Sequence, residues 1–190
     1  MFSYFNRFKK PIQIRGKDPE KIVLTRVGKS NSSNFKSNFV YTGLLQYNTK
    51  LENGDIFECK LRGKTKNFIV VSVRNADASV QATVYECNGV AEIYRSKKVY
   101  DNHGNLKGEA LTKIDEIPTN HVTVNATMRL LNAGLLPSTT KEFRLPKCDI
   151  KLMDRIVMDG ENFCVDAIDT TKFAGMLSVQ TSNDNRKLKK

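Results

Sequence analysis

The chain has 190 residues, of which 39% are hydrophobic and 27% are charged, and it carries a formal net charge of +11. A chain of this length can bury a core for one domain or two small ones, and its composition excludes a fibrous or disordered protein. No apolar run approaches the about 20 residues that a transmembrane helix needs. The first residues lack the aliphatic segment and cleavage site of a secretory signal, so we expect a protein made and assembled inside a cell.

The positive charge is concentrated at the two ends of the chain. Residues 1–36 hold nine Lys or Arg and two Asp or Glu, residues 186–190 hold four Lys or Arg, and the 149 residues between them hold eighteen of each. Basic ends of this kind either bind nucleic acid or an acidic protein surface, or serve as solvated segments that keep a protein soluble. The candidate contacts with DNA or an acidic partner are Arg7, Lys9, Lys10, Arg186, Lys187, Lys189 and Lys190.

The first residues predict a short amphipathic helix. Met1, Tyr4, Phe5 and Phe8 recur at helical spacing, and Pro11 follows as a stop signal. An aromatic stripe like this can dock into a partner's groove, pack on the protein's own sheet or lie on a membrane surface. We favour the first two, because the stripe is short and the chain carries no other lipid signal.

The rest of the chain predicts strands. Segments rich in β-branched and aromatic residues alternate with Gly, Asn and Asp, and the expected strands span residues 21–27, 38–42, 55–61, 67–74, 79–87, 121–130, 154–158, 162–168 and 176–181. Asp159-Gly160 predicts a tight hairpin turn, because glycine adopts positive φ at little cost. We therefore expect an all-β protein of small barrel or sandwich modules, built from antiparallel meanders, with a short N-terminal helix and extended loops.

A turn cluster in the middle of the chain predicts a long exposed hairpin over residues 97–112. Its tip is formed by Asn102, His103, Gly104 and Asn105, residue types that favour turns. We interpret His103 as a turn residue rather than a catalytic one. The hairpin is a candidate gate or inter-subunit contact.

Four segments describe the expected domain organisation. Residues 1–36 form a basic arm, 37–118 a first β-module, 119–185 a second β-module and 186–190 a basic tail. Residues 54–84 and 153–181 also resemble each other, since each has an acidic strand start, an Asn-Phe-x-Val strand and a third strand. A duplicated meander and a chance similarity between two short hairpins both explain this, and we slightly favour chance.

No motif for catalysis or metal binding is present in the sequence. The four cysteines, Cys59, Cys87, Cys148 and Cys164, form no CxxC pair, so we expect buried free thiols rather than a zinc site or disulfides. Gly28-Lys29-Ser30 lacks the earlier glycine of a phosphate-binding P-loop. We therefore expect no enzymatic activity, no cofactor and no bound metal.

A set of residues in the C-terminal third carries a family resemblance. It comprises Gly134-Leu135-Leu136-Pro137, Pro146, Ile150, Asp154-Arg155-Ile156, Gly160, Asn162-Phe163-x-Val165, Gly175-Met176-Leu177-x-Val179-Gln180, Asp184 and Arg186. This pattern resembles head-closure or stopper proteins of tailed-bacteriophage necks, small β-barrels with a Gly turn and an aromatic-x-Val strand. Phe5-Asn6-Arg7-Phe8 is similar to the start of phage minor structural proteins. The chain is longer than a simple stopper, which leaves its position in the neck open.

The resemblance implies a structural virion protein, assembled in the host cytoplasm. Such a protein forms a homo-oligomeric ring that joins portal to tail and helps retain packaged DNA. The implied partners are further copies of the chain, a portal or adaptor protein, tail proteins and, through non-specific contact, double-stranded DNA; no membrane partner is expected. The alternative is a nucleic-acid-binding, OB-like barrel that stacks bases on exposed aromatics such as Phe35, Phe39, Tyr41 and Tyr47.

Overall fold

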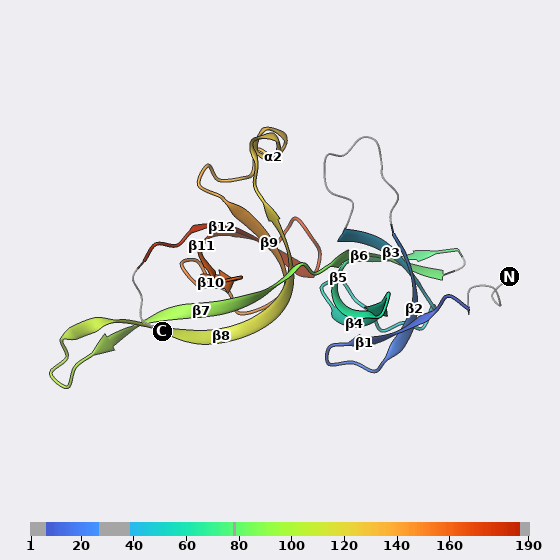
Figure 1. Cartoon of the computed structure of the whole chain (residues 1–190), viewed down its shortest axis with the longest axis horizontal. Helices are drawn as coiled ribbons and strands as arrows, with labels where there is room; N and C mark the ends of the chain where they lie inside the picture. The colour runs from blue at the N-terminus through green and yellow to red at the C-terminus, as the bar shows by residue number, and fades with distance from the viewer. Residues whose placement is uncertain (1–6, 27–38, 78, 187–190) are drawn as a thin grey trace.

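The computed structural model describes residues 7–26, 39–77 and 79–186, and it contains two closed antiparallel barrels of six strands each (Figure 1). The first barrel contains β1 (Lys10–Ile14), β2 (Glu20–Arg26), β3 (Val40–Leu45), β4 (Ile56–Leu61), β5 (Lys64–Ala76) and β6 (Ser79–Glu86). The second contains β7 (Gly89–Tyr100), β8 (Leu106–Thr123), β9 (Lys141–Pro146), β10 (Arg155–Met158), β11 (Glu161–Asp169) and β12 (Met176–Asn183). The expected all-β class is confirmed.

Side chains that alternate between the two faces of each strand fill the interior of the first barrel. In β6, Val80, Ala82 and Val84 point inward and are buried, while the residues between them are partly exposed, as expected for a strand with one face in a core. Phe57 and Phe68 face each other across β4 and β5 and stack with their ring centroids 5.2 Å apart. Burial of these side chains supplies the main driving force for closing the barrel.

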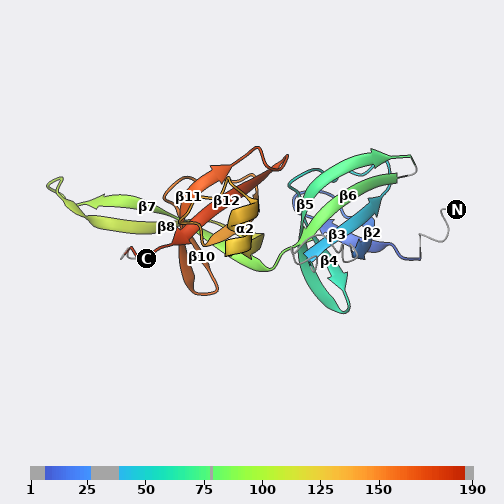
Figure 2. The same ribbon diagram turned by 90° about the horizontal axis from the view of Figure 1, so that it is seen from above.

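The two barrels have the same topology. The strand order is β1-β2-β3-β6-β5-β4 in the first, and β7-β8-β9-β12-β11-β10 when the second is followed in the same direction. Adding six to each strand number of the first barrel therefore reproduces the second. The β4–β5 and β10–β11 hairpins, which occupy equivalent places, project from the same side of the molecule (Figure 2).

Equivalent strands share local details that the order of strands does not require. β5 has a bulge directly after Val70 and β11 has one directly after Val165. The backbone N–H of Val70 donates to the Asp55 carbonyl (2.9 Å), and that of Val165 donates to the Asp154 carbonyl (3.0 Å). Bulges are specific features of a fold, so their recurrence in register indicates a duplicated barrel. The shared bulges therefore favour a duplicated meander over the chance similarity that we slightly favoured from the sequence.

The two equivalent turns also share a backbone conformation. Arg62 and Gly63 between β4 and β5 have φ of 48° and 81°, and Asp159 and Gly160 between β10 and β11 have φ of 51° and 81°. Positive φ at both central residues matches the right-handed twist of a two-residue hairpin. The turn predicted at Asp159-Gly160 is confirmed.

The predicted domain boundaries need correction. The segment expected to be a basic arm contributes β1 and β2 to the first barrel, because Ile12, Ile14 and Ile22 are buried in its core. β7 and β8, placed in the first module by the sequence, belong to the second barrel, because β7 pairs with β10 and β8 with β9. The boundary therefore lies at residues 87–88 instead of 118–119.

The strand expected over residues 121–130 is also wrong in its second half. β8 ends at Thr123 and a short helix, α2 (Ala126–Leu131), begins soon after it. The side chain of Asn125 accepts a hydrogen bond from the Met128 N–H (2.8 Å), which is the arrangement of a helix N-cap. Alternation of polar and apolar residues continued across this cap and concealed it. Residues 1–6 of the predicted N-terminal helix lie outside the described residues, whereas Arg7 and Phe8 lie in a turn.

The barrels are joined through an apolar wall and a two-residue link. Ile56, Ile69, Val71 and Tyr85 of the first barrel pack against the core cluster of the second. In the link, the Asn88 side chain donates to the His121 carbonyl (2.9 Å) and accepts from the His121 N–H (2.8 Å). These contacts fix the link to the second barrel.

A close approach between two backbones completes this junction. Gly54 and Gly175 have φ of +90° and +78°, and a Cβ built on Gly175 would lie 2.2 Å from the Asn53 carbonyl oxygen. No side chain fits there, so glycine is required for both its conformation and its size. Arg144 adds a bridge, since its guanidinium lies 4.7 Å from the ring centroid of Tyr85 in the other barrel.

Candidate interaction surfaces

The β7–β8 hairpin extends beyond its barrel and ends in exposed apolar side chains. β7 and β8 have 12 and 18 residues, whereas the equivalent β1 and β2 have 5 and 7, and the extra length projects away from the first barrel (Figure 1). Val99, Tyr100 and Leu106 near the tip are 40%, 56% and 57% exposed. The predicted hairpin is confirmed, and its role as a gate or inter-subunit contact stays a prediction.

Local hydrogen bonds hold the hairpin tip. The Asp101 carboxylate accepts from the backbone N–H of His103 and of Asn105, both at 2.8 Å, and Gly104 has φ of 81°. Hydrogen bonds of this type are what Asp offers to a turn. Asn102 and His103 are exposed and lie in the turn at this tip.

The base of the hairpin is tied to the barrel by ion pairs. The Arg95 guanidinium donates to Asp154 through two nitrogens (2.9 and 2.8 Å) and to the Asp149 carboxylate (2.9 Å). These hydrogen bonds raise the pKa of Arg95, with the bond to Asp154 the largest cause. Since Asp154 is buried, the pair fixes the direction in which the hairpin leaves the barrel.

A second projection follows β8 and carries α2, whose residues are all at least partly exposed (Figure 1). Leu130 and Leu131 are 87% and 71% exposed. The segment is nevertheless anchored, because the Gln180 side chain donates to the Gly134 carbonyl (2.9 Å) and accepts from the Leu136 N–H (2.8 Å). We refer to residues 124–140 as the α2 arm.

A cavity of about 620 Å³ opens between the α2 arm and the junction of the barrels. Its walls include Phe39, Tyr85, His121, Met128 and Arg144. The His121 Nδ1 and the Arg144 Nε are buried and have no hydrogen-bond partner among the residues that the structure describes. Burial is the main cause that lowers the pKa of His121, followed by the charge of Lys141.

The basic end residues predicted as contacts have different environments. Arg7 is exposed, Lys9 and Lys10 are half-buried at the start of β1, and Lys187, Lys189 and Lys190 lie outside the described residues. Arg186 is not a free tail residue. Its guanidinium donates to the Asp184 carboxylate (2.7 Å) and to the Met153 carbonyl (3.1 Å), so its charge is balanced within the fold.

Asp184 is the centre of this C-terminal network. It also accepts from the buried Arg155 (2.7 Å), and its side chain is 1% exposed. Burial alone would raise the pKa of Asp184, but hydrogen bonds from Arg186 and Arg155 outweigh it and hold the pKa well below its usual range. Sequence reasoning missed this pairing, because nothing in the spacing of Arg155 and Asp184 indicates contact.

The four cysteines are free thiols. Cys59 and Cys164 are buried, as expected, and Cys87 and Cys148 are half-buried. Burial raises the pKa of Cys87 to about 12 and that of Cys148 to about 11, so both are protonated at neutral pH. In the described part of the chain, no three His, Cys, Asp or Glu side chains gather as metal ligands would.

Within residues 7–26, 39–77 and 79–186, no helix is long and apolar enough to cross a bilayer. Comparison with known proteins found no family model and no curated protein that matches this chain.

The candidate surfaces are therefore described from their residues alone. They are two apolar projections on the second barrel, a cavity at the junction and the charged ends of the strands.

Proposed function

We propose that the protein is a structural subunit of a tailed-phage neck, forming a homo-oligomeric ring that joins portal to tail and helps retain packaged DNA. The observation that carries the proposal is the β7–β8 hairpin. It is an addition to a duplicated barrel, it is braced at its base by Arg95, and its tip exposes Val99, Tyr100 and Leu106. A braced projection with an apolar tip is suited to gripping a neighbouring molecule.

The closure of both barrels supports the use of this hairpin in assembly. A closed barrel has no free sheet edge, so a partner strand has nowhere to add along most of the molecule. Among the described strands, residues 95–100 of β7 pair only with β8, and residues 106–119 of β8 pair only with β7. The hairpin therefore offers the edges for strand addition, and a second copy supplies a matching pair.

The α2 arm supplies a second, different apolar contact. A ring needs two complementary surfaces on each subunit, since a heterologous interface closes only when one surface meets another kind. The α2 arm, which exposes Leu130 and Leu131, and the β7–β8 hairpin project from the second barrel at separate points (Figures 1 and 2). This geometry fits a subunit that contacts two neighbours.

Electron microscopy and light scattering of the purified full chain test the ring, alone and mixed with the portal protein. We expect closed rings, and we expect Tyr100→Asp to abolish them by placing a charge in the apolar contact. Tyr47→Asp is the matched control, because Tyr47 is 58% exposed on the first barrel and Tyr100 is 56% exposed. Monomers under both conditions would refute the ring, and equal loss in both variants would refute the role of the hairpin.

A further inference from the structure

The charge of the protein is unevenly divided between the barrels. Within the described residues, the first barrel through Asn88 holds thirteen Lys or Arg and seven Asp or Glu, whereas residues 89–186 hold thirteen of each. The second barrel is therefore neutral and the first is strongly basic. Most of this excess comes from residues 7–26, which hold seven Lys or Arg and two Asp or Glu; the sequence assigned them to a basic arm, and the structure places them in β1 and β2 of the first barrel.

The excess lies at one end of the first barrel, which we call the basic mouth. Here β1, β3 and β5 begin and β2, β4 and β6 end. We count the first three residues of β1, β3 and β5, the last three of β2, β4 and β6, and the turn between β4 and β5. Glu86 is the one acidic residue in this set. The basic residues there are Lys10, Arg26, Lys60, Arg62, Lys64 and Lys66.

The opposite mouth is charged but balanced. Lys17 pairs with Glu52 (2.7 Å) and Asp55 (2.9 Å), and Lys50 pairs with Asp18 (2.8 Å). At the basic mouth, the carboxylate of Glu86 is occupied by Lys66 and by the Tyr41 hydroxyl. Glu86 therefore balances Lys66 and leaves Lys60, Arg62 and Lys64 without an acidic partner among the residues that the structure describes.

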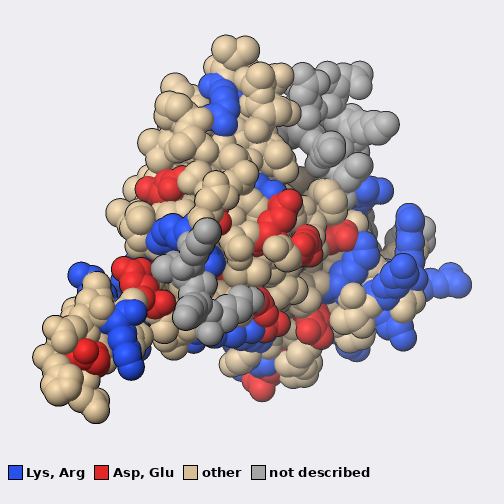
Figure 3. All heavy atoms as spheres, turned by 60° about the vertical axis from the view of Figure 1, so that its left-hand side comes forward, with Lys and Arg blue, Asp and Glu red and all other residues tan. Residues whose placement is uncertain are grey.

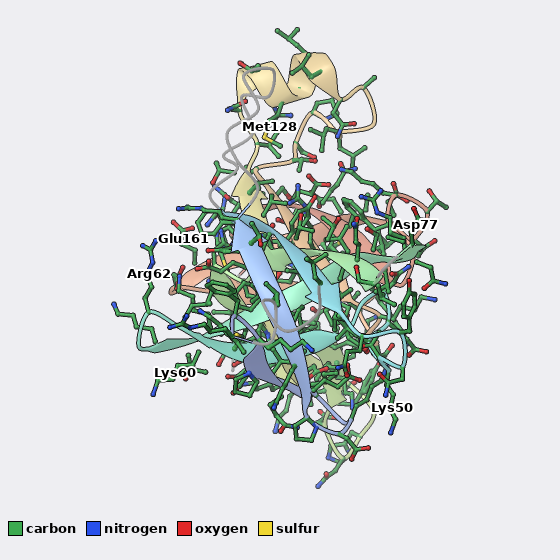
Figure 4. The ribbon with its side chains drawn as sticks, turned by 90° about the vertical axis from the view of Figure 1, so that its right-hand side faces the viewer. Lys50, Lys60, Arg62, Asp77, Met128 and Glu161 are labelled. Atoms are coloured by element: carbon green, nitrogen blue, oxygen red, sulfur yellow. The ribbon has the colours of Figure 1, made fainter. Side chains whose placement is uncertain are left out.

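Three of the basic side chains are free in the described structure. Lys60, Arg62 and Lys64 are exposed and make no ion pair or side-chain hydrogen bond with any residue that the structure describes. Lys60 and Arg62 extend outward from the β4–β5 hairpin (Figure 4). Figure 3 shows Lys and Arg gathered at the right-hand edge of the molecule with few acidic side chains among them.

The equivalent turn of the second barrel shows that the fold does not require this charge. Arg62-Gly63-Lys64 corresponds to Asp159-Gly160-Glu161, with the same backbone conformation and opposite charge. Glu161 pairs with Lys141 (2.8 Å), whereas Lys64 has no such partner in the described residues. Since like charges at close range destabilise a fold, a cluster that the backbone does not need points to a ligand.

We propose that the basic mouth binds the phosphodiester backbone of nucleic acid. Each exposed cation can neutralise one phosphate and release its counterion, which gives affinity without reading bases. The β4–β5 turn exposes long charged side chains and no large apolar residue, so it lacks the apolar centre of a protein interface. An acidic protein partner is thus the poorer match. This binding does not depend on ring formation, so a monomer should bind nucleic acid as well as a ring does.

Fluorescence anisotropy with a short labelled duplex and a single strand of the same length tests the proposal across a salt series. The test variant is Lys60→Gln/Arg62→Gln/Lys64→Gln in the full chain. The control, Lys50→Gln/Lys147→Gln/Lys151→Gln, removes the same charge from exposed sites away from the mouth. Thermal unfolding of both checks that they fold.

We expect wild type and control to bind with the same steep salt dependence. The mouth variant should bind about tenfold more weakly. The slope of log K against log salt should fall by about 2 to 3, because each of the three lost phosphate contacts on a duplex contributes about 0.9. Equal weakening in both variants would overturn the proposal. So would displacement of the DNA by polyglutamate at matched charge, which would assign the mouth to an acidic protein. Whichever of the duplex and the single strand binds more strongly is the form of nucleic acid that the mouth prefers, and either result supports the proposal.

Discussion

The two barrels share one architecture but use the same wall in opposite ways. In the first barrel, the wall formed by β4, β5 and β6 is apolar and packs against the second barrel through Ile56, Ile69, Val71 and Tyr85. Following the strand registers, the equivalent residues of the second barrel are Arg155, Cys164, Asp166 and Ser182. The second wall is polar, and its own C-terminal segment covers it through Arg155, Asp184 and Arg186.

This difference shows which residues carry the fold and which carry association. Phe68 and Phe163 occupy the same interior place in the two barrels, and both are buried. The turn glycines Gly63 and Gly160 also agree. Residues that point outward diverge in polarity and in the sign of their charge. The interior and the turns thus maintain the barrel, while the outer face decides what each barrel meets.

Asp184→Asn should have the largest effect on stability, because it removes the charge that balances Arg155 inside the second wall. The Arg155 side chain is 5% exposed, and breaking a buried pair by removing one partner costs about 3 to 5 kcal/mol. Asp18→Asn breaks an exposed pair with Lys50 and should cost far less, because solvent screens that pair. Denaturant unfolding measures both, and equal costs would contradict the distinction between a buried pair in the second wall and an exposed pair on the first barrel.

The same network predicts a pH dependence of stability. Because the pKa of Asp184 is held below its usual value, the stabilisation is fully present above the carboxyl's unfolded pKa of about 4 and is lost as pH falls through the folded value. Wild-type unfolding free energy should therefore decline below about pH 4, and Asp184→Asn should show less of this decline. Parallel curves for the two proteins would show that other carboxyls dominate.

Gly175→Ala should disrupt the junction between the barrels. Its Cβ would lie 2.2 Å from the Asn53 carbonyl oxygen, and overpacking together with the strain of positive φ should cost about 3 kcal/mol. Gly160→Ala is the matched control, since Gly160 has a similar φ of +81° and nothing within 4 Å of the added atom. Its expected cost is about 1 kcal/mol, measured in the same unfolding experiment.

Alkylation of Cys87 should report opening of that junction. Burial raises its pKa from 9.0 to about 12, so at pH 8 its thiolate fraction is about a thousandfold below that of an ordinary thiol. Mass spectrometry should find slow modification in the wild type and faster modification in Gly175→Ala. The Gly160→Ala protein should react at the wild-type rate. Similar rates in all three would show that the thiol reacts without separation of the barrels.

Exchanging the charges of the equivalent turns should have the smallest effect on stability. Arg62→Asp/Lys64→Glu gives the first barrel the turn residues of the second, and exposed substitutions of this kind usually change stability by about 0.5 kcal/mol or less. Unfolding should be nearly unchanged while binding to labelled DNA is lost. A large destabilisation would show that the basic turn serves the barrel itself.

Local patterns in the sequence were enough to predict part of this molecule. Strand propensity and turn chemistry act between near neighbours, so the all-β class, the hairpin around Asn102 to Asn105 and the turn at Asp159-Gly160 could be predicted. The same local reasoning failed at Asn125, where a helix cap interrupts an alternating pattern. It also placed β7 and β8 in the wrong module, because strand pairing joins residues far apart in the chain.

The sequence by itself determined the strands, the turns and the total charge of this protein. Tertiary structure alone decided which strands close into which barrel, that the barrels repeat each other, and where the charge gathers. Lys10, Arg26 and Lys64 are far apart in the chain and meet at one mouth only because the strands that carry them close into a ring of hydrogen bonds. Arg186 looked like part of a basic tail until the fold placed it against Asp184, where proximity in space cancels its charge.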